Sequence, residues 1–201
     1  DVIAAQEFSS ANALNTFVGV LNSATGSPGD WAAAPFLDGP DSESVLVYRT
    51  SKVTFVRVVT VAVGGNPPEQ PRNTYRYDFR PAGYGDVPAN TIAVYNVHLK
   101  SGDTTDDIAR RLLETTRIRD NAETLPAGTH FMMAGDTNTQ SSNQTAYVQL
   151  VGSQAVNTGR FYDPINSPGP WNNNANFRYI HTQDPIGAGG MDDRHDQILV
   201  S

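Results

Sequence analysis

The chain of 201 residues contains no cysteine. This absence excludes disulfide bonds, thiolate metal sites and a cysteine nucleophile. Long apolar runs are missing too, because VTFVRVVTVAV, residues 53–63, is broken by Arg57 and is too short to span a bilayer. No basic and apolar leader precedes the first strand, and the first residue is Asp1 rather than methionine. We therefore expect a processed chain or an excised fragment without a membrane segment.

Positive charge is in short supply, with 14 Lys and Arg against 21 Asp and Glu and a net charge of −7. This balance argues against a general nucleic-acid coat protein, since such proteins bind mainly by neutralising phosphates. It is compatible with an enzyme that has a local basic groove and a bound divalent cation. With 38% hydrophobic and 17% charged residues, the chain is neither a disordered polymer nor a coiled coil. We expect one domain over residues 1–201 with a sizeable core.

Apolar periodicity and turn residues predict many strands and a few helices. The expected strands cover residues 1–7, 44–49, 52–63, 74–80, 91–99, 130–136, 177–182 and 195–201. The expected helices cover residues 9–26, 104–125 and 145–152, and residues 153–176 are rich in loops. This mixture indicates an α/β sandwich.

Five of these elements carry more specific predictions. The polar turn Thr50-Ser51 joins the second and third strands and suggests a hairpin. Residues 74–80 alternate like a half-exposed strand, whereas the nearly continuous apolar run at 91–99 is typical of a strand covered on both faces. The long helix at 104–125 begins with a capping sequence, and several of its charged residues are expected to form a solvated, ion-paired face: Arg110, Arg111, Glu114 and Arg117.

The stretch MMAGDTN places an acid and an amide two residues apart, where an apolar strand ends. Residues i and i+2 of an extended backbone face the same way, so Asp136 and Asn138 should be directed at one point. The alternative is a simple turn pair, because both residue types cap loops by binding nearby backbone.

Three other strands carry a reactive polar residue at or near an end, namely Glu7, His98 and Asp196. Together with Asp136 and Asn138 they form an oxygen-rich set with one imidazole, which suits Mg²⁺, Mn²⁺ or Ca²⁺ better than zinc or copper. Each also has an ordinary structural explanation: a surface carboxylate, a core histidine, and an aspartate paired with Arg194.

Four segments in order along residues 1–201 resemble the endonuclease/exonuclease/phosphatase superfamily, which includes deoxyribonuclease I. These segments are DVIAAQE, NVHLKSG, AGDTNTQ and DDRHDQILVS. The resemblance implies a four-layered, deoxyribonuclease I-like α/β sandwich. It also implies phosphoester hydrolysis assisted by Mg²⁺ or by a similar ion such as Mn²⁺ or Ca²⁺.

The same resemblance assigns roles to individual residues. Glu7 looks like the metal-binding glutamate, and His98 looks like the histidine that donates a proton or hydrogen bond to the phosphoryl group. Asp136 and Asn138 match the pair that orients the attacking water and holds a phosphate oxygen, and Asp136 is a second metal ligand. Asp196 matches an aspartate that hydrogen-bonds within the site. Arg72 is a further candidate, for binding the substrate phosphate.

The chain departs from the family pattern at both ends. An earlier strand with an asparagine, and an SDH segment with the second catalytic histidine, are expected from the resemblance but are absent from residues 1–201. The domain is therefore expected to be incomplete at both ends. Thr137 also stands where the family usually has an aromatic residue.

Three functions remain open from the sequence. The first is a nuclease or other metal-dependent phosphodiesterase acting as a monomer, with a nucleic acid as the expected substrate. The second is a lipid or sugar phosphatase, or a sphingomyelinase-like phosphodiesterase. The third is a non-catalytic binding module on the same scaffold. The sequence leaves the cellular location open, with a secreted or periplasmic one as a guess.

Overall fold

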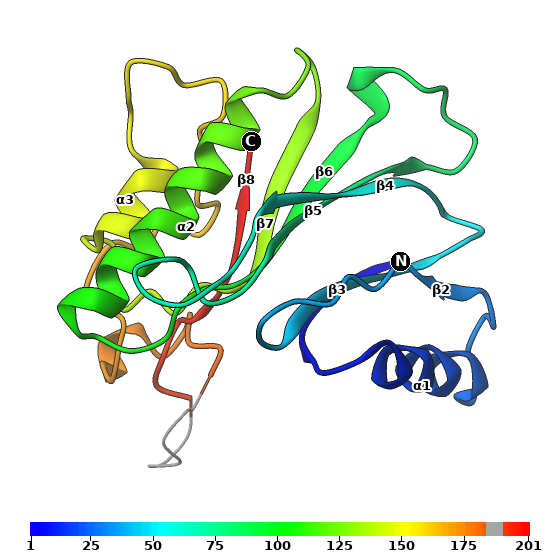
Figure 1. The fold of residues 1–201 in the computed structure, drawn as a ribbon, viewed down its shortest axis with the longest axis horizontal. Helices are drawn as coiled ribbons and strands as arrows, with labels where there is room; N and C mark the ends of the chain where they lie inside the picture. The colour runs from blue at the N-terminus through cyan, green and yellow to red at the C-terminus, as the bar shows by residue number, and fades with distance from the viewer. Residues whose placement is uncertain (184–190) are drawn as a thin grey trace.

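The computed structural model describes residues 1–183 and 191–201, and it contains two β-sheets that face each other (Figure 1). The smaller sheet has the strand order β1-β3-β2 and the larger sheet has the order β4-β5-β6-β7-β8. All neighbouring strands are antiparallel except β6 and β7. The strands are β1 (Val2–Phe8), β2 (Trp31–Ala33), β3 (Glu43–Arg49), β4 (Val53–Ala62), β5 (Thr74–Pro81), β6 (Ile92–His98), β7 (His130–Asp136) and β8 (Asp196–Val200).

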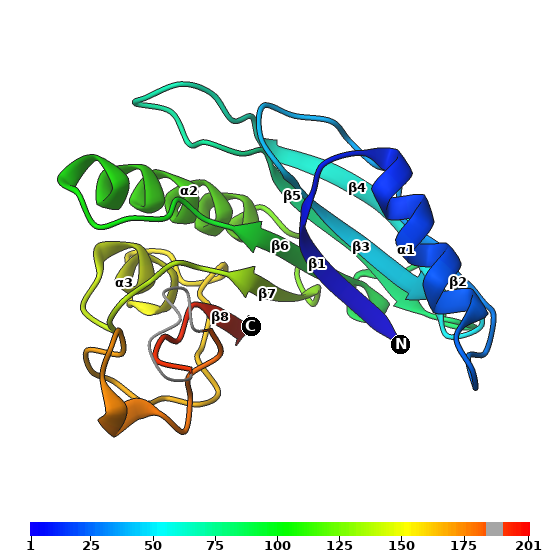
Figure 2. The same cartoon turned by 90° about the horizontal axis from the view of Figure 1, so that it is seen from below.

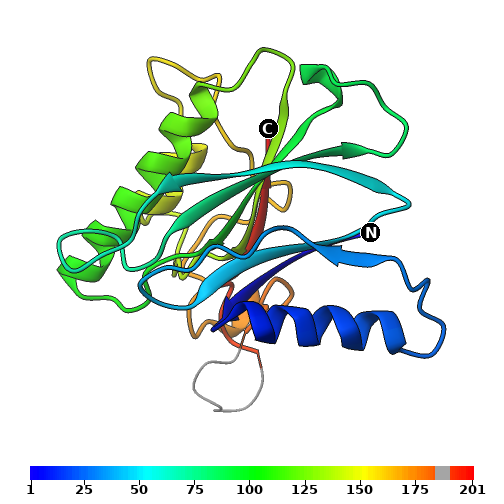
Figure 3. The ribbon, with the colours of Figure 1, turned by 45° about the vertical axis from the view of Figure 1, so that its right-hand side comes forward.

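Helices cover the outer faces of both sheets, which gives four layers (Figure 3). The α-helices are α1 (Ala11–Ser23), α2 (Thr105–Glu123) and α3 (Thr145–Val151), and two 3₁₀ turns span Pro88–Asn90 and Ala175–Phe177. Helix α1 lies against the smaller sheet, while α2 and α3 lie side by side on the larger one (Figure 2). The predicted four-layered α/β sandwich is therefore confirmed. Within the described residues, no helix is both long and apolar enough to cross a membrane.

Three apolar clusters fill the spaces between the layers. Leu14 of α1 packs with Val45 and Val47 of the smaller sheet. Between the two sheets, Leu46 packs with tyrosine and phenylalanine side chains of β5. The third cluster joins β6, β7 and β8 to α2, where Ile118 is completely buried. Burial of these faces holds both sheets at fixed positions beneath the site described below.

The predicted hairpin is wrong, although both of its strands exist. Strand β3 pairs with β1 and β2, and β4 pairs with β5, so the Thr50-Ser51 turn carries the chain from one sheet to the other. Neither turn residue has a positive φ. A two-residue hairpin turn needs such a backbone and usually takes it from glycine or asparagine, so these two residues do not close a hairpin.

Strand β5 is buried on both faces, contrary to the half-exposed strand expected at residues 74–80. Its alternating polar positions carry a charged pair, with Arg76 Nε donating to Asp78 Oδ1 over 2.8 Å. Arg76 also donates to Asn121 of α2 over 2.7 Å. Charged residues are buried when they are paired in this way, so alternation alone misjudged the exposure.

Two further expectations are wrong. Residues 177–182 form no strand, and the chain there runs through the end of a 3₁₀ turn and a loop. On α2, Arg110, Arg111 and Glu114 are buried rather than solvated, at 8%, 0% and 1% exposure. The contacts of Arg111 and Glu114, described below, replace those that water would make.

Candidate active site

Three of the predicted site residues form one row on the inner face of the larger sheet. In the parallel pairing of β6 and β7, His98 is opposite Asp136, and in the antiparallel pairing of β7 and β8, Asp136 is opposite Asp196. Side chains directly opposite each other lie on the same face of a sheet. The row lies at the end of β6 and β7, where the chain leaves the sheet, and its position follows from strand register.

Glu7 reaches this row from the smaller sheet. A bulge in β1 lies between Ala5 and Phe8, and Glu7 adopts a positive φ of 66° there. Bulges re-aim side chains, and they are common beside active sites. Glu7 Oε1 is 3.9 Å from Nδ1 of His98, while Asp136 Oδ2 is 3.9 Å from its Nε2. The imidazole therefore lies between two carboxylates that come from different sheets.

Asn96 holds β1 against β6 and so fixes this arrangement. Its side-chain nitrogen donates to the carbonyl of Ala5 over 2.9 Å and to that of Val45 over 2.7 Å. Its side-chain oxygen accepts a hydrogen bond of 2.5 Å from Gln6. Asn96 is 1% exposed, so these bonds satisfy its amide without water. Sequence reasoning did not single out Gln6 or Asn96 as site residues, although both belong to the quoted motifs.

The carboxylates of Asp136 and Asp196 are bridged by Gln183. Gln183 Nε2 is 3.1 Å from Asp136 Oδ2 and 2.9 Å from Asp196 Oδ2. The other oxygen of Asp136 accepts a bond of 2.8 Å from the backbone nitrogen of Asn138. Gln183 lies in a loop with no motif around it, so no sequence signal identified it.

Asn138 and Arg72 bind the backbone that leaves β6. Asn138 has a φ of 49°, and its side-chain nitrogen donates to the carbonyl of Leu99 over 3.0 Å. Arg72 donates to the carbonyl of His98 over 3.3 Å and lies 3.1 Å from a carboxylate oxygen of Asp41. The structure thus brings all six predicted site residues together. Arg72 contacts the backbone of His98 rather than its ring.

His98 has a lowered pKa. Burial of the ring disfavours the charged imidazolium and is the largest cause, and the nearby Arg72 guanidinium adds to it. The carboxylates of Asp136 and Glu7 act in the opposite direction without reversing the shift. The lowered pKa favours the uncharged form of the imidazole, and a histidine can exchange a proton with a bound group.

Comparison with known proteins identifies the fold. No protein-family model matches the chain, and no curated protein sequence matches it. Solved structures do match over 100% of the chain. A humanized D. rerio TDP2 with 14 mutations has a TM-score of 0.63 at 15% identity, with 69% of its own chain covered. The human Nocturnin catalytic domain with a bound sulfate anion has a TM-score of 0.59 at 16% identity, also with 69% covered.

A third match is an endonuclease/exonuclease/phosphatase family protein from Bacteroides thetaiotaomicron, with a TM-score of 0.58, 18% identity, 100% of this chain and 67% of the other covered. The chain has the endonuclease/exonuclease/phosphatase fold. At these identities the comparison establishes the architecture, which is the one expected from the four motifs, and activity has to be argued from the site.

In this endonuclease/exonuclease/phosphatase fold, the close approach of β6 and β7 depends on Gly135. Its φ is 130°, a conformation that other residues rarely adopt, and an added Cβ would collide with the carbonyl oxygen of Val97.

Thr137 stands where the family resemblance predicts an aromatic residue, and it is 1% exposed. Its hydroxyl donates to the carbonyl of His195 over 2.8 Å, which connects the site loop to the start of β8.

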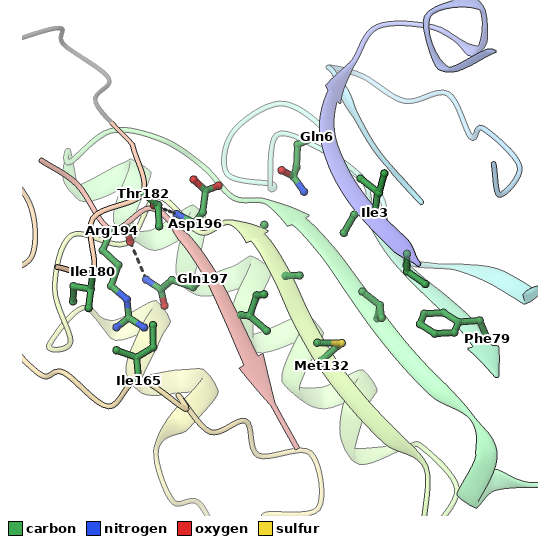
Figure 4. Close-up of a pocket in the computed structure, with 16 residues that line it drawn as sticks. Ile3, Gln6, Phe79, Met132, Ile165, Ile180, Thr182, Arg194, Asp196 and Gln197 are labelled. Carbon is green, nitrogen blue, oxygen red and sulfur yellow. Dashed lines mark hydrogen bonds between the residues drawn. The ribbon is translucent and has the colours of Figure 1, made fainter. Parts of the chain in front are cut away.

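An apolar groove of about 660 Å³ adjoins the site between β1 and β8 (Figure 4). Its walls are mainly apolar side chains of β1, β7 and β8, such as Ile3, Met132 and Ile198. Ile198 of β8, for example, is 56% exposed. Gln6 and Asp196 form its polar end, where the backbone nitrogen of Asp196 donates to Thr182 over 3.0 Å.

The donor set of the site fits a hard divalent cation. In residues 1–183 and 191–201, no three His, Asp or Glu side chains form a ready-made metal cluster. Mg²⁺ is commonly held by one or two carboxylates together with water and substrate phosphates, so it does not need such a cluster. Glu7, whose side chain is 73% exposed, and Asp136 provide two carboxylates on either side of His98.

Proposed function

We propose that the protein is a divalent-metal-dependent phosphodiesterase with a nucleic acid as its substrate. One observation carries the proposal: the imidazole of His98 lies between the carboxylates of Glu7 and Asp136, in a row that continues to Asp196. The architecture of the family supports hydrolysis of phosphoesters, and one solved structure with this fold, D. rerio TDP2, contains a single-strand DNA product.

Charge explains why a cation is needed. Three carboxylates converge on the position that an anionic phosphodiester would occupy, and they would repel it. Glu7 and Asp136 are the residues that would hold a divalent ion, with Mg²⁺ first and Mn²⁺ or Ca²⁺ as alternatives. Such an ion supplies positive charge against the phosphoryl oxygens and the developing transition state.

The chain's own groups provide the rest of the chemistry. His98 donates a hydrogen bond or a proton to the phosphoryl group, a role that typically contributes roughly 10²–10⁴-fold to the rate. Asp136 orients the attacking water, and its own orientation is fixed by the backbone of Asn138 and by Gln183. Asp196 shares Gln183 with Asp136 and keeps that amide in place.

The test is hydrolysis of supercoiled plasmid and of bis(p-nitrophenyl) phosphate with Mg²⁺, Mn²⁺, Ca²⁺ or EDTA. We expect metal-dependent turnover that His98→Ala and Asp136→Asn each lower by at least 10²-fold, in line with about 10²–10⁴-fold for a lost proton-transfer group. His130→Ala is the matched control, because His130 is an exposed residue at the opposite end of β7. Absence of metal-dependent hydrolysis of every phosphoester tested, including phospholipid head groups and sugar phosphates, contradicts the proposal.

Thermal unfolding with added Mg²⁺ distinguishes an enzyme from a non-catalytic scaffold. An ion at 100 times its Kd stabilises the folded state by about 2.7 kcal/mol. We expect this stabilisation in the wild type and its loss in Glu7→Gln. An unchanged melting temperature over millimolar Mg²⁺ favours the binding module.

A further inference from the structure

The backbone that follows His98 is bound to β7 only at its start, where the Leu99 nitrogen donates to the Asp136 carbonyl over 2.8 Å, and is held beyond that point by side chains. It runs from Leu99 to Gly102, between the end of β6 and the capping residue of α2, and we call it the 99–102 segment. Backbone N–H and C=O groups outside helices and sheets need other hydrogen-bond partners, such as side chains. Asn138 Nδ2 donates to the Leu99 carbonyl over 3.0 Å, and the Lys100 nitrogen donates to Glu114 Oε2 over 2.8 Å. Arg111 donates through Nη2 to the Gly102 carbonyl over 3.0 Å and through Nη1 to the Lys100 carbonyl.

Two of these side chains, Arg111 and Glu114, come from α2. They are three residues apart, so they lie on the same face of the helix, and they are 0% and 1% exposed. Burying an arginine and a glutamate is costly unless hydrogen bonds replace their water. Both direct polar atoms at the same three-residue stretch of backbone, which indicates that the helix holds this segment in place.

The position of this backbone matters because, within the described residues, no hydrogen bond fixes the His98 ring. In the described part of the chain, His98 Nδ1 is buried and makes no hydrogen bond. The carboxylates of Glu7 and Asp136 are each 3.9 Å from a ring nitrogen, beyond hydrogen-bond distance. The direction of the ring therefore depends on the packing around it and on the backbone that carries it. The 99–102 segment directly follows His98, and its contacts with α2 hold that backbone in place.

We propose that Arg111 and Glu114 are positioning residues for His98, which they orient through the backbone of the 99–102 segment. The role rests on the function proposed above, in which His98 acts on the phosphoryl group. Neither residue touches the substrate. Their loss should lower kcat, because a displacement of about 1 Å at a reacting group can cost about 10²-fold in rate, and it should leave KM nearly unchanged.

The chain offers a matched control for Arg111 in Arg119. Arg119 is on the same helix, is also 0% exposed, and its guanidinium donates to the carbonyls of Leu150 and Gly152 at the C-terminal end of α3. Replacement of either arginine by methionine removes a buried guanidinium that binds backbone carbonyls. We expect Arg111→Met to lower kcat for bis(p-nitrophenyl) phosphate by about 10- to 100-fold. Arg119→Met should lower stability comparably while kcat stays within about twofold of the wild type.

A double-mutant cycle distinguishes positioning from general loss of structure. Once His98 has been replaced by alanine, Arg111→Met should have no further effect on kcat, because no imidazole remains to be misplaced. At the second helix position, Glu114→Ala should reduce kcat, and Glu114→Gln should restore most of it by keeping an oxygen that accepts the Lys100 amide. A full additional loss in the His98→Ala background, or equal losses for alanine and glutamine, overturns the proposal.

The outcomes also separate this proposal from the proposed function. A wild-type protein without metal-dependent hydrolysis overturns the function and this role together. An active wild type in which Arg111→Met retains full kcat overturns the positioning role alone, and so does an Arg119→Met variant that loses as much kcat as Arg111→Met. Hydrogen exchange of the Lys100 amide checks the contact itself, with faster exchange expected in Glu114→Ala than in Glu114→Gln.

Discussion

Replacing Glu114 by glutamine should change how the stability of the protein depends on pH. Glu114 is 1% exposed, and burial raises the pKa of its carboxyl from an ordinary value of 4.5 to about 7. Burial is the largest cause, and it outweighs the opposing effects of the Lys100 amide and of nearby arginines, Arg72 first among them. Glutamine keeps an accepting oxygen for the amide but has no proton to release.

The sign and the size of the effect follow from linkage. Between pH 4.5 and about 7 the unfolded chain has released the Glu114 proton while the folded protein still holds it, so the wild-type free energy of unfolding falls as pH rises. This contribution to stability is fully present below pH 4.5 and is lost above about pH 7. At about 1.4 kcal/mol per pH unit, the interval corresponds to about 3 kcal/mol.

Urea unfolding of both proteins from pH 4.5 to 8 is the assay. The difference between variant and wild type removes the contributions of all other titrating groups, provided that the m-values agree. We expect this difference to shift in favour of Glu114→Gln by about 3 kcal/mol as pH rises through the window. A constant difference would refute the reasoning, since it would mean that the arginines and the amide fully compensate for burial. A shift in favour of the wild type would show that they outweigh it.

Three further predictions concern stability. Gly135→Ala should cost about 2 kcal/mol or more in urea unfolding, from backbone strain and collision with the Val97 carbonyl, whereas Gly19→Ala, in an open helical position, should stabilise by about 0.5–1 kcal/mol; equal effects would contradict this. Asn96→Ala should cost about 2–4 kcal/mol and most of the hydrolytic activity, because it releases β1 from β6, and a variant that keeps both argues against that role. Thr104→Ala, which removes the cap of α2, should lower Tm by about 2–4 °C, and an unchanged Tm would show that the cap contributes nothing.

The sequence was most informative where a residue type conflicts with its local surroundings. An acid after an apolar strand, as at Asp136, or a histidine within one, as at His98, has no packing advantage and therefore signals chemistry. Strand register then places these residues in one row, because the ends of neighbouring strands meet at one edge of a sheet. The apolar periodicity of the strands and helices predicted an α/β sandwich, and the four layers were expected only from the resemblance carried by the four motifs.

Tertiary contacts were much harder to predict than the elements themselves. The separation of β3 and β4 into different sheets has no signature beyond a turn without glycine or asparagine. The charged residues of β5 and α2 have the spacing of solvated faces, and only the partners they meet reveal that they are buried. Gln183 stands in a loop, 47 residues from Asp136 and 13 from Asp196, and has no motif around it, so its role depends on the folded arrangement.

Residues that react and residues that position them differ in how visible they are in the sequence. Residues that perform chemistry are conspicuous because their side chains are unusual at the end of an apolar strand. Residues that hold them in place, such as Arg111 and Asn96, have side chains that are ordinary for a helix or a strand, and their function lies in which backbone atoms they bind. A variant of the first kind removes a reacting group, whereas a variant of the second kind leaves every reacting group present and displaces one. The two kinds are therefore separated by measurement of kcat in the presence and absence of His98, and not by inspection of the motifs.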